Sequence, residues 1–171
     1  MAKRKVFYSF HFDNDCRRTQ LVRNIGVIEG NKPVSANEWE EVNRKDAVKK
    51  WIDDNLKNKS CTIVLIGTET SERPLVKYEI ERSWELGKAV FGIYIHNLKD
   101  TDGTQCKKGK NPFDKIYKNK FISDSSLSSH TDIYDPPYSD SKKVYNYIAE
   151  NIESWIERAI ERREMQKPWE I

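Results

Sequence analysis

Polar side chains interrupt an apolar segment near the start of the chain. The segment is KVFYSFHF, residues 5–12, and it places Ser9 and His11 on either side of Phe10. A hydroxyl group and an imidazole can hydrogen-bond the oxygen atoms of a ligand, and an aromatic ring can offer its face to a flat ring. Two interpretations are open from the residue types alone: the floor of a small-molecule pocket, or a capped turn between a strand and a helix.

A glutamate in the middle of the chain is the other residue with chemistry to offer. In the segment 74–88, Val76 and Ile80 recur at helical spacing and predict an apolar stripe. Glu79 lies beside that stripe in an early turn, where its carboxylate can face a crevice at the end of the sheet. The alternative is that Glu79 only stabilises its helix. A carboxylate near the start of a helix is favoured by the helix dipole, and Glu79 can also pair with Arg82.

Three apolar runs predict the strands of the fold that holds these residues. They lie at residues 4–10, 61–67 and 89–95, and the last two read CTIVLIG and AVFGIYI. Nearly continuous apolar runs of this length are typical of strands buried on both faces of a parallel sheet. Ligands of such sheets bind beyond the carboxyl ends of the strands, which is where Ser9 and His11 stand.

Helical segments separate the predicted strands. Asp13 or Asn14 can cap the first of them, and residues 28–42 have room for one short edge strand. Connections this short require right-handed crossovers. The predicted helices span residues 13–27, 43–56 and 74–87. The fold class is therefore α/β, with an open parallel sheet flanked by helices on both faces.

The remainder of the chain divides into an insertion and a final helix. Residues 96–141 hold three of the six prolines and many polar residues, which predicts a long irregular insertion with room for an edge strand near 130–134. Isoleucine and valine then repeat every four residues from Val144 to Ile160, so we expect a core-facing helix over 142–163. All 171 residues are expected to form one domain.

Composition and motifs exclude several classes of protein. Thirty Lys and Arg against 27 Asp and Glu give a net charge of +3, too small an excess to indicate nucleic-acid binding. No apolar run reaches the roughly 20 residues of a membrane span, and the basic start leads into a strand-like segment rather than a signal peptide, so we expect a cytoplasmic protein. GxGxxG, GxxxxGK[ST] and GxSxG motifs are absent. Cys16, Cys61 and Cys106 lie far apart and predict no metal site.

Three segments resemble the TIR domains, and together they resemble the TIR-like subfamily of the bacterial Thoeris anti-phage defence system. VFYSFHFDND at 6–15 is similar to the first conserved box, a strand of the VFISY-x-x-x-D type. TIVLIGTETSERPLVKYEIERSWELGKAVFGIYI at 62–95 is similar to the strand, helix and strand around the family's glutamate. KKGKNPFDKI at 107–116 is the most specific to the Thoeris subfamily. The resemblance covers roughly residues 4–116 and implies a flavodoxin-like fold.

The resemblance also implies an activity, the cleavage of NAD+ by an NAD+ glycohydrolase or ADP-ribosyl cyclase. Glu79 falls on the family's catalytic glutamate, whereas Leu75 stands where many TIR enzymes carry tryptophan. The residues that the resemblance places along the substrate cleft are Ser9, Phe10, His11, Asn37 and Trp39. NAD+ would be the substrate, with no further cofactor, and a cyclic ADP-ribose-type product would activate a separate effector protein.

A single glutamate is enough for this chemistry. Glycosidases use two carboxylates because the leaving oxygen must be protonated, whereas nicotinamide leaves NAD+ as a neutral ring. One carboxylate can then stabilise the positive charge on the ribose. The runner-up hypothesis is a non-catalytic TIR-like adaptor, and a weaker one is a nucleoside-processing glycosyl transferase. A phage-derived trigger, self-assembly into a homo-oligomer and the isomer of the product stay open.

Overall fold

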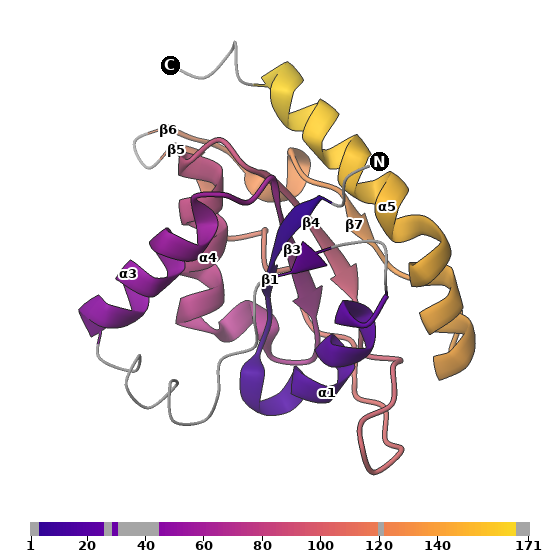
Figure 1. Cartoon of the computed structure of the whole chain (residues 1–171). Coiled ribbons are helices and arrows are strands. Elements are labelled where there is room, and N and C mark those ends of the chain that lie inside the picture. Colours follow the sequence, from indigo (N-terminus) through magenta and orange to yellow (C-terminus); the bar gives the residue numbers. More distant parts are fainter. Residues whose placement is uncertain (1–3, 26–28, 31–44, 120–121, 167–171) are drawn as a thin grey trace.

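A five-stranded parallel sheet forms the centre of the molecule (Figure 1). The computed structural model describes residues 4–25, 29–30, 45–119 and 122–166. The strand order is β2-β1-β3-β4-β7, and the strands are β1 (Lys5–Ser9), β2 (Glu29–Gly30), β3 (Cys61–Ile66), β4 (Ala89–Tyr94) and β7 (Ile133–Tyr134). The predicted α/β class with an open parallel sheet is confirmed, as is the short edge strand expected within residues 28–42.

Helices cover both faces of this sheet. The helices are α1 (Phe12–Arg23), α3 (Lys45–Leu56), α4 (Pro74–Glu85) and α5 (Ser141–Gln166). Figure 1 shows α3 and α4 on one side of the sheet and α5 on the other. Helix α1 packs in the same cluster as α5. Every residue of β3 and β4 is buried, because apolar side chains of both faces pack under helices. Within the described helices, no segment is long and apolar enough to cross a membrane.

The pleat of the strands assigns side chains to the two faces. Ile63 and Leu65 pack in the cluster that includes Val22 of α1 and Ile148 of α5. Val64, on the opposite face, packs in the cluster formed with α4. Two-residue alternation therefore decides which side of the sheet a polar side chain at a strand end will face.

The segment 96–141 contains more regular structure than the sequence predicts. β7 confirms the edge strand expected near 130–134, since Gly92 of β4 pairs with Ile133. The hairpin β5 (Tyr117–Asn119) and β6 (Ile122–Ser126) was missed, because its strands are short and carry no clear apolar alternation. Two short 3-10 helices, η1 (Thr70–Glu72) and η2 (Leu127–Ser129), complete the described elements.

The first helix begins and ends earlier than predicted. His11 is its N-cap residue, not Asp13 or Asn14, and its side chain makes no capping hydrogen bond. The last residue of the helix is Arg23 rather than Val27. The cap residues of the prediction are instead in the first turn, so Asp13 stabilises the helix through its charge near the amino end.

Candidate active site

The carboxyl ends of β1 and β3 form the topological switch point of the sheet. From β1 the chain continues to β2 on one side, whereas β3 lies on the other side of β1. Crossover connections leave in opposite directions from such a point, and the crevice outside the strand ends is the usual ligand site of an open α/β sheet. The helices α1 and η1 start here, directly after β1 and β3.

Ser9 and Glu79 face each other beside this switch point. Ser9 ends β1 on the same face as Phe7, which packs against α3, and it is fully buried. Glu79 lies in the second turn of α4 and is half-buried. Burial raises the pKa of Glu79 to about 8, and the nearby Ser9 hydroxyl partly offsets that rise. Ser9 Oγ nevertheless completes no hydrogen bond of ordinary geometry with the described residues, so the contact is loose.

The backbone of Glu79 is anchored to the sheet. Ser83 Oγ donates to the Glu79 carbonyl oxygen at 2.6 Å. The same hydroxyl lies 2.7 Å from Thr62 Oγ1 on β3, and both side chains are buried. This pair of contacts fixes the turn of α4 that carries Glu79 against the neighbouring strand.

The wall beside Glu79 is apolar on the side of α3. Leu75, one turn before Glu79, packs against the cluster of Phe7 and Ile52. Tyr78 joins the same cluster and donates its hydroxyl to Asp53 Oδ1 at 2.9 Å. The helix turn that carries Glu79 thus packs on an apolar cluster shared with α3.

His11 and Asp15 add polar groups that are buried at the same edge. His11 Nδ1 and Asp15 Oδ2 have no hydrogen-bond partner among the residues that the structure describes. A buried polar atom without a partner typically costs about 1–3 kcal/mol, so several at one place are unusual in a purely structural region. Asp15 was not among the predicted site residues, although it closes the VFYSFHFDND segment that carries the family resemblance.

The structure separates Phe10 from this group. Its side chain packs on the cluster under α1 and α5, and its ring lies 6.2 Å from that of Phe12. That cluster is on the face of the sheet opposite Ser9 and Glu79. Asn37 and Trp39 lie outside the described residues. The structure therefore brings together Ser9, His11 and Glu79 at one edge of the sheet, but not Phe10.

A loop of the insertion lies over the end of β3. Thr68 Oγ1 donates to the Lys107 carbonyl oxygen at 2.6 Å. Lys108 is held by Asp135, with Nζ 2.8 Å from Oδ2, and its ammonium lies 4.6 Å from the centre of the Tyr94 ring. The loop thus lies against the carboxyl ends of β3 and β4, and it also contacts α1, since Arg18 donates to the Leu98 and Thr104 carbonyl oxygens. Among the described residues, no group of three or more His, Cys, Asp or Glu side chains is arranged to hold a metal ion.

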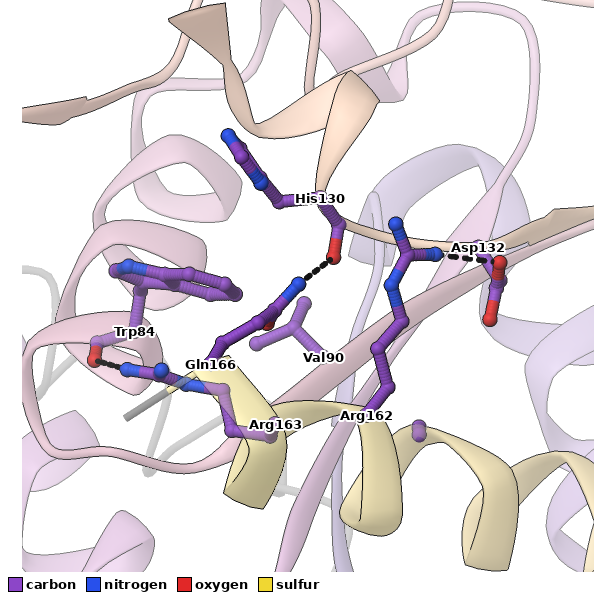
Figure 2. Close-up of a pocket in the computed structure, with 8 residues that line it drawn as sticks. Trp84, Val90, His130, Asp132, Arg162, Arg163 and Gln166 are labelled. Carbon is purple, nitrogen blue, oxygen red and sulfur yellow. Dashed lines mark hydrogen bonds and ion pairs between the residues drawn. The ribbon is translucent and has the colours of Figure 1, made fainter. Parts of the chain in front are cut away.

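A small hollow lies at the opposite edge of the sheet (Figure 2). It is bounded by Trp84 at the end of α4, Val90 at the start of β4 and the last turns of α5. Arg163 Nη2 donates to the Trp84 carbonyl oxygen at 2.9 Å, and Arg162 pairs with Asp132 at 2.6 Å. These contacts fasten the carboxyl end of α5, and the hollow holds none of the predicted site residues.

Two comparisons with known proteins show which family the chain resembles. Residues 7–100 match the family model described as Thoeris protein ThsB, TIR-like domain. The chain is also 41% identical over 123 residues to a protein of Bacillus cereus (strain MSX-D12) that carries the name "Putative cyclic ADP-D-ribose synthase ThsB1". The matched part is 68% of this chain and 64% of the relative, so the chain covers less than two thirds of that relative's length.

Proposed function

The chain belongs to the family of Thoeris ThsB TIR-like domains, and from this premise we propose that it cleaves NAD+ and makes a cyclic ADP-ribose-type signal in anti-phage defence. The observation that carries the proposal is Glu79, a half-buried carboxyl group with its pKa raised to about 8, beside Ser9 at the switch point of the sheet. A perturbed carboxyl group in a crevice at the strand ends is the usual mark of a functional site.

Glu79 would act on the nicotinamide ribose. When the bond between C1′ of the ribose and the nicotinamide nitrogen breaks, its electron pair leaves with nicotinamide, and positive charge builds on the sugar. An ionised Glu79 stabilises that charge most strongly in a site that excludes water. The raised pKa means that the carboxyl group of the free protein holds its proton at neutral pH. The cationic nicotinamide ring of bound NAD+ favours the ionised form, so substrate binding itself would prepare the carboxylate.

The acceptor of the ribose decides the product. Water that bonds to C1′ loses a proton and gives linear ADP-ribose. A hydroxyl group of the same molecule that bonds to C1′ loses its own proton and closes a ring, and an adenine ring nitrogen that bonds to C1′ closes a ring with loss of a proton from the exocyclic amine. The name of the Bacillus cereus relative favours the cyclic product. That product would act on a separate effector protein, and infection by phage would supply the trigger. NAD+ is the substrate in this scheme, and no further cofactor takes part.

The test is NAD+ consumption in cells that make the protein, with and without phage, with products resolved by mass spectrometry. We expect NAD+ to fall and an isomer of ADP-ribose to rise. Glu79→Gln removes the charge at similar volume and should lower turnover by at least about 10²-fold, the usual cost of losing a group that stabilises transition-state charge. Glu81→Gln is the matched control, since Glu81 is on the same helix and, among the described residues, pairs with Lys77 at 3.9 Å.

The outcomes separate the enzyme from the adaptor. A folded Glu79→Gln variant that consumes NAD+ at the wild-type rate would remove Glu79 from the reaction. If folded wild-type protein consumes no NAD+ in either state, the non-catalytic adaptor becomes the better assignment.

A further inference from the structure

A pair of buried hydroxyl groups joins the helix that carries Glu79 to the sheet. Thr62 of β3 and Ser83 of α4 are fully buried, and their side-chain oxygen atoms lie 2.7 Å apart. Ser83 Oγ also lies 2.6 Å from the Glu79 carbonyl oxygen. The hydrophobic cluster between α4 and this face of the sheet includes Val64, Ile66, Val76, Ile80 and Trp84. The two hydroxyl groups are therefore a polar contact within an apolar interface.

The number of protons gives this contact a direction. A serine hydroxyl has one proton, and a carbonyl oxygen only accepts. The proton of Ser83 therefore goes to the Glu79 carbonyl oxygen, and the proton between the two hydroxyl groups belongs to Thr62. The hydrogen bonds thus run from Thr62 through Ser83 to the backbone of Glu79. A serine in a helix often bonds the carbonyl oxygen four residues earlier, so the link to Thr62 is what distinguishes this one.

These hydrogen bonds start on the strand that lies next to Ser9. Thr62 and Val64 are two residues apart on the same face of β3, about 7 Å along the strand. Val64 is paired with Ser9 of β1, and Ser9 is the residue that Glu79 faces. The anchor of the helix and the residue opposite the carboxyl group are thus held on neighbouring strands of one sheet.

Hydrogen bonds fix the helix in a way that apolar contacts do not. Apolar attraction is non-directional, so an apolar cluster tolerates a small shift of the helix along the sheet. A hydrogen bond weakens steeply when its distance or angle changes. The same part of α4 is also tied to α3, by Arg82 Nε at 3.0 Å from Asp53 Oδ1, but both of these side chains are about one-third exposed and compete with water. The buried pair of Thr62 and Ser83 is shielded from that competition.

We propose that Thr62 and Ser83 are positioning residues for Glu79: they hold its carboxyl group opposite Ser9, where it stabilises the positive charge of the transition state. This role rests on the proposed function. Neither side chain touches NAD+, since both are buried between α4 and the sheet. Their effect on the reaction passes through the backbone of Glu79, and a displacement of about 1 Å is enough to slow an enzyme by about 10²-fold.

The test replaces one hydroxyl group by a methyl group. Thr62→Val keeps the shape of the side chain, and Ser83 still donates to the Glu79 carbonyl oxygen. Steady-state turnover of NAD+ by the full-length chain, under the conditions in which the wild type is active, gives kcat and KM. We expect kcat to fall about tenfold and KM to change by less than about twofold, because the lost interaction is made in the transition state. Thr62→Ser keeps the hydroxyl group and should keep the wild-type kcat.

A second measurement does not depend on turnover. Burial raises the pKa of Glu79 to about 8. NMR titration of its carboxyl carbon, with the signal assigned by comparison with Glu79→Gln, measures that pKa. If α4 is released from Thr62, water reaches the carboxyl group more easily, so the midpoint of the titration in Thr62→Val should move to lower pH. Thr62→Ser should keep the wild-type midpoint.

Thr131→Val is the matched control. Thr131 is buried and donates to the Leu127 carbonyl oxygen at 2.7 Å, in the segment that joins η2 to β7. The change removes the same group from a buried hydrogen bond, so it should destabilise the fold but leave kcat and the titration of Glu79 unchanged. Ser83→Ala removes both contacts of the pair and provides a second arm if Thr62→Val fails to fold.

The outcomes separate positioning from stability. A folded Thr62→Val protein with the wild-type kcat and an unchanged titration overturns the proposal. An equal loss of kcat in Thr131→Val also overturns it, because a general loss of stability would then explain both variants. If the wild type consumes no NAD+, the proposed function fails and the role in catalysis falls with it, whereas the titration still shows whether the hydroxyl pair holds the carboxyl group.

Discussion

The two edges of the sheet differ in the contacts of their buried polar side chains. At the edge formed by the amino ends of the strands, here called the amino edge, Arg162 is paired with Asp132 (Figure 2). Arg163 lies 3.9 Å from the centre of the Trp84 ring and donates to the Trp84 carbonyl oxygen. At the carboxyl edge, buried atoms of Ser9, His11 and Asp15 lack partners among the described residues.

The difference indicates which edge serves stability and which serves binding. A buried polar group that is hydrogen-bonded stabilises the folded chain or at least offsets its own desolvation. A buried polar group without a hydrogen bond destabilises the folded chain unless a ligand supplies the partner. The contacts at the amino edge therefore stabilise the packing of the end of α5 on the rest of the fold. At the carboxyl edge Arg18 is held by Asp15 and by the Leu98 and Thr104 carbonyl oxygens, whereas the Ser9 hydroxyl beside Glu79 completes no hydrogen bond of ordinary geometry among the described residues. Departures of this kind from full hydrogen bonding are typical of sites that bind a ligand.

The largest effect of a single substitution on stability at neutral pH is expected at the amino edge. Arg163→Ala removes a buried cation from the Trp84 ring and from its carbonyl oxygen. The loss of packing and of a charged hydrogen bond should lower the free energy of unfolding by about 2–4 kcal/mol. Urea unfolding measures this change, and NAD+ turnover per folded molecule should be unchanged. A loss of turnover in fully folded protein would mean that the two edges are not separate in function.

The pH dependence of the free energy of unfolding should show the raised pKa of Glu79 at the carboxyl edge. Glu79 has its pKa raised from 4.5 to about 8 in the folded chain, so between these pH values the folded state holds a proton that the unfolded state has released. Stability must then fall as pH rises through this range, by at most about 1.4 kcal/mol per pH unit from this group. The difference between wild type and Glu79→Gln, measured by urea unfolding at several pH values, isolates the effect. A difference that is flat with pH would mean that the carboxyl group is not desolvated.

The smallest effect is expected for Ser9→Ala. This change removes a buried hydroxyl group that completes no hydrogen bond of ordinary geometry, so the free energy of unfolding should stay the same or rise by up to about 1 kcal/mol. It also removes the group that lowers the pKa of Glu79, so that pKa should rise further. Unfolding curves and NMR titration of the Glu79 carboxyl carbon measure the two quantities. Destabilisation above about 1 kcal/mol would show that Ser9 is partnered in solution and would weaken the contrast between the edges.

Much of the fold could be predicted because its signals are local. The runs CTIVLIG and AVFGIYI are strands β3 and β4, and each is buried along its whole length. The apolar repeat of residues 142–163 is the core-facing stripe of α5, with Val144, Ile148 and Ile152 fully buried. The position of Glu79 beside the stripe of Val76 and Ile80 also follows from helical spacing. In each case, neighbours in the sequence supply the pattern.

Residue patterns along the chain are enough to predict the α/β class, the order of the main elements and a short list of polar residues at strand ends. Which of those residues meet depends on how the folded elements pack. Phe10, which follows β1, packs on the face opposite Glu79, and Asp15 packs against Gly67, where a Cβ atom would overlap its carboxylate. Gly67 is 52 positions away along the chain, so no local pattern can report that contact. Periodicity describes one element at a time, whereas a site at the edge of a parallel sheet depends on how separate elements pack.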